Sequence, residues 1–158
     1  MIADLQVVGG NAIADQLEER LLAAPVPGMR TITADDLPAE HFFAPGLYAR
    51  SLFRPAGTLI VGHAHRHAHL AIVLHGRLRV LVDGKVREIV GPSKPFLTEG
   101  GVRKATFAVE DTTLITFHPT DKTDLDELEE ELIEKSPAFI EAERSGQLEQ
   151  LRTLSLSQ

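Results

Sequence analysis

The chain lacks cysteine and tryptophan, and it has one tyrosine and seven phenylalanines among its 158 residues. The absence of cysteine excludes a disulfide, a thiolate metal site and a cysteine nucleophile. With so few aromatic rings, the core is expected to be built mainly from aliphatic side chains. No apolar run approaches the roughly 18 residues that a membrane-spanning helix needs. The opening residues, MIADLQVVGG, lack a basic leader and a long apolar centre, so they do not resemble a signal peptide.

Positive charge is also scarce, since 16 lysines and arginines stand against 23 aspartates and glutamates and give a net charge of −7. An acidic chain has no general affinity for nucleic acid or for an anionic membrane surface, so we expect neither as a partner. The content of 43% hydrophobic and 25% charged residues is typical of a globular protein. The length suits a single core. We therefore expect a soluble, cytoplasmic protein.

Both ends of the chain have a helical pattern. Residues 1–28 are expected to form a helical and then irregular N-terminal extension, with a helix that Asn11 can cap. Residues 121–158 are expected to form a C-terminal helical extension, because leucines recur there at helical spacing. The candidate caps of its helices are Thr123 or Asp124 for the first, and Ser136, followed by a proline, for the second.

Residues 29–120 consist of short alternating segments at regular spacing, which is typical of a sandwich or barrel of β-strands. The clearest signal is RLRVLVDGKVREIV, Arg77–Val90. There Asp83-Gly84 separates two alternating segments and predicts a tight hairpin. A second tight turn, at Glu110-Asp111, is expected to join the last two strands of this region into another hairpin.

The stretch VGHAHRHAHL, Val61–Leu70, contains four of the seven histidines: His63, His65, His67 and His69. Alternate residues of a strand point to one face, so this stretch either directs several imidazoles to one point or displays a polar face to water. Imidazole is the commonest side chain for binding transition metals, and two histidines at i and i+2 can reach one ion. If the chain turns at Arg66–Ala68, His69 returns as a third ligand, and His67 remains in the exposed turn.

The spacing of these histidines resembles the first motif of the cupin superfamily. That motif is a glycine, five residues, His-x-His, three or four residues, a glutamate, six residues and a glycine. Here Gly57 precedes His63 and His65 at the family spacing, and His69 replaces the glutamate at the correct distance before Gly76. The resemblance implies a mainly β fold, a single cupin-type jelly-roll β-barrel with flanking N- and C-terminal helices. Because cupins are usually dimers, it also implies a homodimer.

The second cupin motif is matched less well. Gly91, Pro95 and Gly100 or Gly101 resemble its skeleton with altered spacing, and the family's histidine would fall near Arg103 or Lys104. Neither side chain is a metal ligand. Arg103 is either a residue that holds an anionic ligand such as a carboxylate or a solvated residue at a strand start. For Lys104 we expect the solvated position.

His118 is the candidate that replaces the missing histidine. A tight turn at Glu110-Asp111 would pair His118 directly with Arg103 and place both on one face of the hairpin. That face is the more apolar one and is therefore expected to point inward. It would carry Ala105, Phe107, Val109 and Leu114.

A larger part of the chain, from Leu47 to Ile133, is similar to a group of short cupin-like proteins from bacteria and their phages. The segments that carry this similarity are PAGTLIVG with the following histidines, GGVRK and EDTTLITFHPTDKTDLDELEEELI. In that group, the positions that match His65, His69 and His118 recur more regularly than the position of His63. The similarity names no reaction.

The leading hypothesis is therefore a divalent transition metal, Fe, Mn, Ni or Zn, held in the barrel by four candidate ligands: His63, His65, His69 and His118. A neutral all-histidine shell would leave the ion its full charge, and it would polarise a small oxygenated molecule that the protein either acts on or senses. The alternative is a non-catalytic binding, structural or accessory protein, including one associated with a phage. A third reading is a barrel without metal, in which the histidines only form hydrogen bonds. The sequence leaves open whether a reaction occurs.

Overall fold

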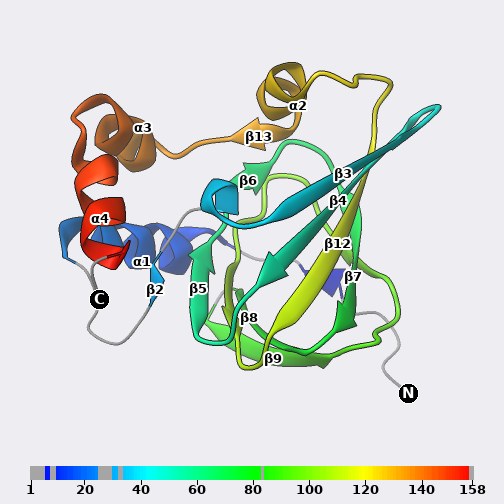
Figure 1. Ribbon diagram of the computed structural model, residues 1–158, viewed down its shortest axis with the longest axis horizontal. Helices are drawn as coiled ribbons and strands as arrows, with labels where there is room; N and C mark the ends of the chain where they lie inside the picture. Colours follow the sequence, from blue (N-terminus) through cyan, green and yellow to red (C-terminus); the bar gives the residue numbers. More distant parts are fainter. Residues whose placement is uncertain (1–5, 8–9, 25–29, 32–33, 83, 157–158) are drawn as a thin grey trace.

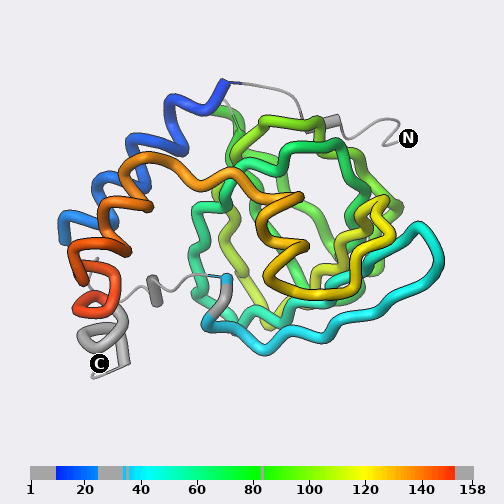
Figure 2. The backbone as a smooth tube through the Cα atoms, turned by 90° about the horizontal axis from the view of Figure 1, so that it is seen from above, coloured from blue at the N-terminus to red at the C-terminus, as the bar shows by residue number. Residues whose placement is uncertain are grey.

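The computed structural model describes residues 6–7, 10–24, 30–31, 34–82 and 84–156. It shows two mainly antiparallel sheets that face each other, with one helix across an end and three helices beside them (Figures 1 and 2). The six-stranded sheet contains, in spatial order, β1 (Gln6–Val7), β10 (Phe96–Thr98), β7 (His69–His75), β12 (Thr112–Pro119), β4 (Leu47–Arg54) and β3 (Ala39–Ala44). The five-stranded sheet contains β2 (Arg30–Thr31), β5 (Thr58–Val61), β11 (Ala105–Ala108), β8 (Arg77–Val82) and β9 (Lys85–Val90). This architecture confirms the predicted fold class.

The remaining elements are a short strand pair and the helices. The strand pair is β6 (Ala64–His65) with β13 (Ile133–Glu134), and a 3-10 turn, η1, spans Ala34–Asp36. The helices are α1 (Ala12–Ala23), α2 (Leu125–Leu132), α3 (Pro137–Arg144) and α4 (Gln147–Leu156). None of the helices in the described ranges is long and apolar enough to span a membrane.

The main core lies between the two sheets and is almost entirely aliphatic, as the composition predicts. Its buried members come from both sheets and, in the case of Val102, from the loop before β11: Ala71, Val73, Leu78, Val80, Ile89, Phe96, Val102 and Leu114. A second apolar cluster joins α1 to the C-terminal helices through Leu22, Phe139, Ala142 and Leu148. The three helices α1, α3 and α4 therefore form one layer beside the barrel.

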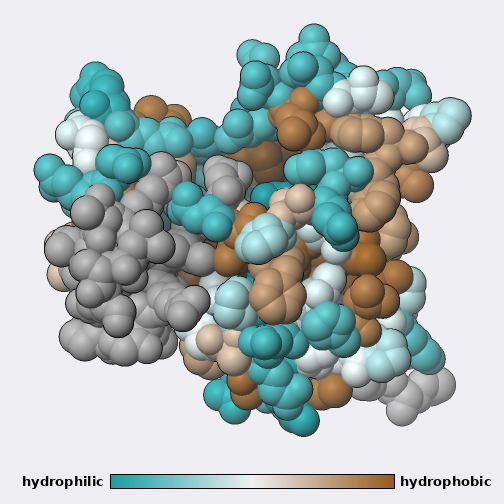
Figure 3. Space-filling view, viewed as in Figure 1, coloured by the Kyte–Doolittle hydropathy of each residue, from teal (hydrophilic) through white to brown (hydrophobic). Residues whose placement is uncertain are grey.

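Helix α2 covers one end of the barrel (Figure 2). Its inner residues Leu128 and Leu132 are buried against Tyr48 of β4. The opposite face of α2 is strongly acidic, and hydrophilic side chains gather over it at the top of Figure 3. Apolar side chains gather lower on the same view, over β3, β4 and β12.

Several local predictions are confirmed. Strands β8 and β9 pair as a hairpin, although Asp83 in its turn lies outside the described residues. The Asp124 carboxylate accepts hydrogen bonds from the backbone N–H groups of Asp126 and Glu127, both at 3.1 Å, and so caps α2. The Ser136 hydroxyl accepts one from the N–H of Phe139 at 3.1 Å and caps α3. These motifs are short-range, so local sequence determines them.

The predicted hairpin at Glu110-Asp111 is wrong. Strand β11 pairs with β5 and β8, whereas β12 pairs with β4 and β7, so the chain crosses there from one sheet to the other. The predicted inward face of β11 is wrong as well. Thr106 faces the cavity between the sheets, whereas Ala105 and Phe107 lie on the other side with Leu17. A hairpin register does not apply to strands that belong to different sheets.

Candidate metal centre

Three histidines converge at one end of the barrel interior. One ring nitrogen from each of His65, His69 and His118 lies within 4.8 Å of the other two. The ring centroids are 4.3 Å apart for His65 and His69, 4.9 Å for His69 and His118, and 5.2 Å for His65 and His118. Three imidazoles so close together are a donor set that suits a divalent transition metal.

The first two histidines are positioned by a turn, as the sequence predicts. His65 ends β6 and pairs with Ile133 of β13, and its carbonyl accepts a hydrogen bond from the N–H of Gly101 at 2.7 Å. The chain bends through residues 66–68, and His69 then begins β7 opposite Thr98. His67 lies exposed in this bend, which confirms its predicted place.

The third histidine comes from the six-stranded sheet. His118 lies opposite Tyr48 in the pairing of β12 with β4, and not opposite Arg103. Because side chains alternate along β12, Leu114, Thr116 and His118 all point between the sheets. The structure therefore brings His118 to the other two histidines by a route different from the predicted one.

Burial makes the three imidazoles poor bases. Burial, then the positive charge of Lys104, lowers the pKa of His69 to about 3. Burial, then the charges of Arg50 and Lys104, lowers the pKa of His118 to about 4. Burial and the neighbouring His69 hold the pKa of His65 well below its usual value. All three rings are therefore neutral at pH 7, the form that offers a lone pair to a metal.

His69 has an additional property expected of a ligand. It is 2% exposed, and within the described part of the chain neither of its ring nitrogens has a hydrogen-bond partner. Buried polar atoms of proteins are nearly always satisfied, so an unpaired buried imidazole calls for an explanation. A bound metal ion would satisfy one of these nitrogens. The residues present thus fit the metal that the sequence pattern predicts.

Side chains around His118 hold its ring in place. Its Nε2 lies 2.9 Å from the hydroxyl oxygen of Thr116, which can accept or donate a hydrogen bond there. The ring stacks on that of Tyr48, with centroids 5.7 Å apart. The Tyr48 hydroxyl lies 2.7 Å from Nδ1 of His41, on the neighbouring strand β3. His41 also lines the cavity, although no sequence pattern singled it out.

The histidines open into a cavity of about 390 Å³ between the two sheets and α2. Apolar side chains form most of its wall, and α2 contributes Leu125, Leu128 and Leu132. The volume is in the range of small-molecule sites. Polar side chains from the strands and from the loop before β11 also line it: Arg50, Arg54, Lys104, Thr106 and Thr116.

His63, a predicted ligand, lines this cavity but does not belong to the group of three. Its ring meets Phe139 of α3 edge-on, with centroids 4.4 Å apart. The residue lies between β5 and β6, where the chain is not paired as a strand. Strict alternation from His63 to His65 therefore does not apply, and the i, i+2 rule overestimates their convergence.

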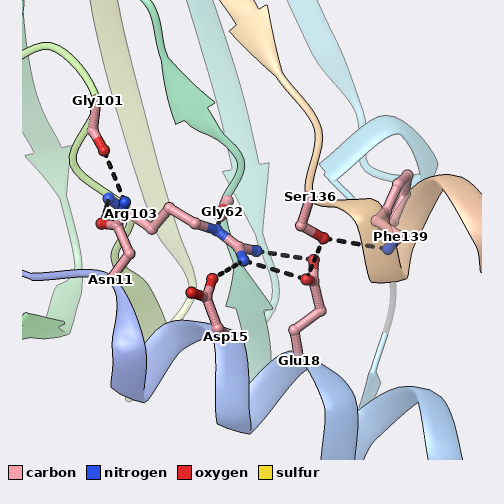
Figure 4. Close-up of polar contacts among 8 residues, drawn as sticks. All are labelled: Asn11, Asp15, Glu18, Gly62, Gly101, Arg103, Ser136 and Phe139. Carbon is pink, nitrogen blue, oxygen red and sulfur yellow. Dashed lines mark hydrogen bonds and ion pairs between the residues drawn. The ribbon is translucent and has the colours of Figure 1, made fainter.

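Arg103, the predicted anion-binding residue, does not line the cavity. Its guanidinium is 4% exposed and donates to Glu18 at 2.7 and 3.1 Å, to Asp15 at 2.6 Å and to the carbonyl of Gly62 at 3.0 Å (Figure 4). Two carboxylates of α1 thus neutralise its charge. Asn11, at the start of α1, also accepts from the Arg103 backbone N–H at 2.7 Å. Arg103 therefore joins α1 to the barrel.

The basic residues inside the barrel were not predicted from the sequence. Lys104, expected in solvent, lines the cavity, as do Arg50 and Arg54. One signal was present in the sequence, since Tyr48, Arg50, Leu52 and Arg54 alternate along one strand. Arginines on a strand usually point to solvent, so the alternation alone assigns them to the wrong face.

No protein-family model matches the sequence, and no curated protein is significantly similar to it. Solved structures with similar backbones include a cupin superfamily protein of Desulfitobacterium hafniense, with 10% identity and a TM-score of 0.48 over 55% of this chain and 80% of that one. A cupin-2 domain protein of Shewanella frigidimarina has 11% identity and a TM-score of 0.46 over 70% of this chain and 100% of that one. A cupin 2 domain-containing protein from Halorhodospira halophila has 16% identity and a TM-score of 0.46 over 60% of this chain and 75% of that one. All three structures are described as cupins, the family whose first motif the histidine spacing resembles. At identities of 10–16% and TM-scores below 0.5, these matches assign no activity to this chain.

Proposed function

We propose that the protein binds one divalent transition metal ion through His65, His69 and His118. The observation that carries this proposal is the convergence of their three ring nitrogens within 4.8 Å. The neutral state of the rings and the unpaired nitrogens of His69 support it. Three protein ligands would leave further coordination positions free for water or for a small oxygenated molecule in the cavity. The metal would be Fe, Mn, Ni or Zn, because all four accept imidazole ligands.

The metal would act as a Lewis acid that polarises an oxygen atom of the bound molecule. The residues of the chain would supply orientation and a dry site. Thr116 orients the His118 ring by its hydrogen bond, and the apolar side chains of α2 exclude water from the end of the cavity.

A second candidate is a binding module without catalysis, a sensor or an accessory protein. The favouring observation is the position of the acidic residues that line the cavity. Glu18 is bound to Arg103, and Asp126 and Glu129 lie exposed on α2. A general base must lie within hydrogen-bond reach of the reacting proton. Within the described ranges, the group of three consists of histidines alone, without a carboxylate. The absence of a free carboxylate beside the histidines favours a binding role over catalysis by a carboxylate base.

The metal proposal is tested by the metal content of the purified protein, measured by inductively coupled plasma mass spectrometry. We expect about one ion per chain in the wild type and none in the His65→Ala/His69→Ala variant. The matched control is His67→Ala/His75→Ala, which removes two exposed histidines and should keep the metal. A wild-type protein that takes up no metal, even after incubation with Fe, Mn, Ni and Zn, would contradict the proposal.

A cobalt-substituted protein separates the two candidates. If a coordination position is open, small oxygenated ligands should change the visible absorption of the Co²⁺ ion. A reactive site needs such a position. A spectrum that no ligand changes, together with an unchanged melting temperature after chelation, would favour the structural or accessory role.

A further inference from the structure

Arg54 and Lys104 lie inside the barrel, and neither has a carboxylate partner among the residues that the structure describes. Arg54 of β4 is 6% exposed, and its guanidinium donates to the hydroxyl of Thr106 on the opposite sheet. Its Nε is buried and, within the described residues, has no partner. The Lys104 ammonium donates to the hydroxyl of Thr98 at 3.0 Å. Both side chains line the same cavity as the three histidines.

Arg103 shows how this protein neutralises a buried cation whose role is structural. Arg103 is as little exposed to solvent as Arg54, and the carboxylates of Glu18 and Asp15 bind it. Arg54 and Lys104 form hydrogen bonds only to neutral threonine hydroxyls among the described residues. Solvent exposure does not distinguish these side chains, so the missing carboxylates at Arg54 and Lys104 need another explanation.

A positive charge removed from water without a counter-charge is unfavourable, and proteins normally pair such charges. Here the two cations are also close enough to repel each other. Burial and then the charge of Arg54 lower the pKa of Lys104 to about 8, and burial lowers the pKa of Arg54 to about 10. Both groups nevertheless remain mainly protonated at pH 7. The described residues therefore leave the positive charge of this cavity unbalanced.

The acidic residues on the cavity wall do not provide this balance. Glu18 is bound by Arg103 and contacts Ser136. Glu129 lies on the exposed side of α2 and pairs with Lys135 at 3.1 Å. Asp126 is exposed on the same helix. A negatively charged ligand inside the cavity would supply the missing charge.

We propose that the cavity binds a small molecule that carries an oxyanion, either a carboxylate or a phosphate, between Arg54 and Lys104. Arginine suits this group because its planar guanidinium presents several N–H donors, and lysine adds a compact charge. The rest of the molecule extends toward the three histidines. This second part of the assignment rests on the proposed metal function, whereas the anion site itself does not.

A metal ion would strengthen the need for an anion. A divalent ion at the three neutral histidines would share the cavity with two further positive charges. Lys104 is near enough to all three rings to lower their pKa values. An anionic ligand would offset this repulsion, so metal and anion should each favour the binding of the other.

The test uses the full chain in two forms, chelator-treated and zinc-loaded, at constant ionic strength. The probes are sodium malonate, sodium phosphate and the neutral analogue malonamide. Thermal unfolding and isothermal titration calorimetry report binding. We expect at least one anion to raise the Tm of both forms by a few degrees, because it binds only the folded state, and malonamide to leave it unchanged. A response to malonate alone assigns a carboxylate, and a response to phosphate alone assigns a phosphate.

The Lys104→Met variant keeps the length of the side chain and removes its charge. It should weaken anion binding by about tenfold or more, since a charge-assisted hydrogen bond is lost. The control Lys122→Met changes an exposed lysine outside the cavity and should bind as the wild type does. If Lys104→Met does not fold, Arg54→Met is the second variant, with the same expected loss.

The outcomes keep the two proposals apart. If the protein binds metal but neither anion changes Tm in either form, the anion proposal is wrong and the metal proposal stands. If an anion stabilises the chelated protein while no metal binds, only the metal proposal is wrong. Anion binding that needs the metal and is unchanged in Lys104→Met and Arg54→Met would overturn the assigned residues.

Discussion

The imidazole ring of His118 stacks on that of His65, with centroids 5.2 Å apart and planes inclined by 14°. His118 belongs to the six-stranded sheet, whereas His65 belongs to the short pair formed by β6 and β13. Strand β13 directly follows α2, the helix that covers the end of the barrel. The histidine group is thus assembled where the barrel and the C-terminal segment meet. Correct docking of α2 is therefore a condition for the geometry of the site.

His63 and His69 are expected to differ sharply in their contribution to metal binding. His69→Ala should weaken metal affinity by about a hundredfold or more, because it removes one of three ligands. His63→Ala should bind metal nearly as the wild type does, since its ring packs on Phe139 outside the group. Competition with a chromophoric chelator measures both affinities. An equal loss in the two variants would place His63 among the ligands and contradict the geometry.

Thr116 is expected to act on the metal through His118. Thr116→Val removes the hydroxyl that lies 2.9 Å from Nε2 and should lower metal affinity by about tenfold. Thr113→Val is a matched control on the same strand, because its hydroxyl contacts Nε2 of the exposed His75 at 2.8 Å. Chelator competition compares the two variants. Equal affinities would show that Thr116 does not position the ligand.

The metal-free protein should lose stability as the pH falls from about 6.5 toward 4. The pKa values of His69 and His118, about 3 and about 4 in the folded state, lie below the usual histidine value. In this range the unfolded chain binds more protons than the folded chain, so the free energy of unfolding decreases with decreasing pH. Above pH 6.5 both states hold these rings neutral, and the contribution is constant.

The expected loss by pH 4 is on the order of 3 kcal/mol for each ring and so about 6 kcal/mol for the two together, and urea unfolding in the presence of chelator measures it. Carboxylates also begin to titrate near pH 4, so a variant is needed to isolate the histidines. His69→Gln/His118→Gln should show a flatter dependence between pH 6.5 and 4. A wild-type curve as flat as that of the variant would argue against buried neutral rings.

The contact between Arg103 and Glu18 should contribute strongly to stability. Arg103→Met leaves Glu18 buried without its partner and should lower the free energy of unfolding by about 3 kcal/mol. The double variant Arg103→Met/Glu18→Gln should recover part of this loss, because no charge remains buried. Arg79→Met, at an exposed ion pair with Glu88, should have a much smaller effect, because solvent screens such pairs. Urea unfolding measures all three variants, and an equal effect of Arg79→Met and Arg103→Met would contradict the argument.

Local sequence was enough to predict the features in which neighbouring residues interact. The hairpin around Gly84, the caps Asp124 and Ser136 and the bend that returns His69 beside His65 were all predicted from short segments. Each depends on backbone hydrogen bonds or side-chain alternation within one short segment, which are local properties. The histidine spacing also indicated the fold class, because it combines a strand, a turn and a second strand.

Tertiary structure alone determined which strands pair, and this decided the contents of the cavity. Alternation along β12 places His118 and Thr116 on one face, but it does not say which strand lies opposite. The pairing of β12 with β4 brings His118 to Tyr48, and the crossing to the other sheet sends β11 elsewhere. The positions of Arg54 and of Arg103 depend on the same long-range choices. Charge alone predicts a solvent-exposed position for both side chains. Only the packing of α1 and the two sheets shows that carboxylates neutralise Arg103 and that Arg54 lines the cavity.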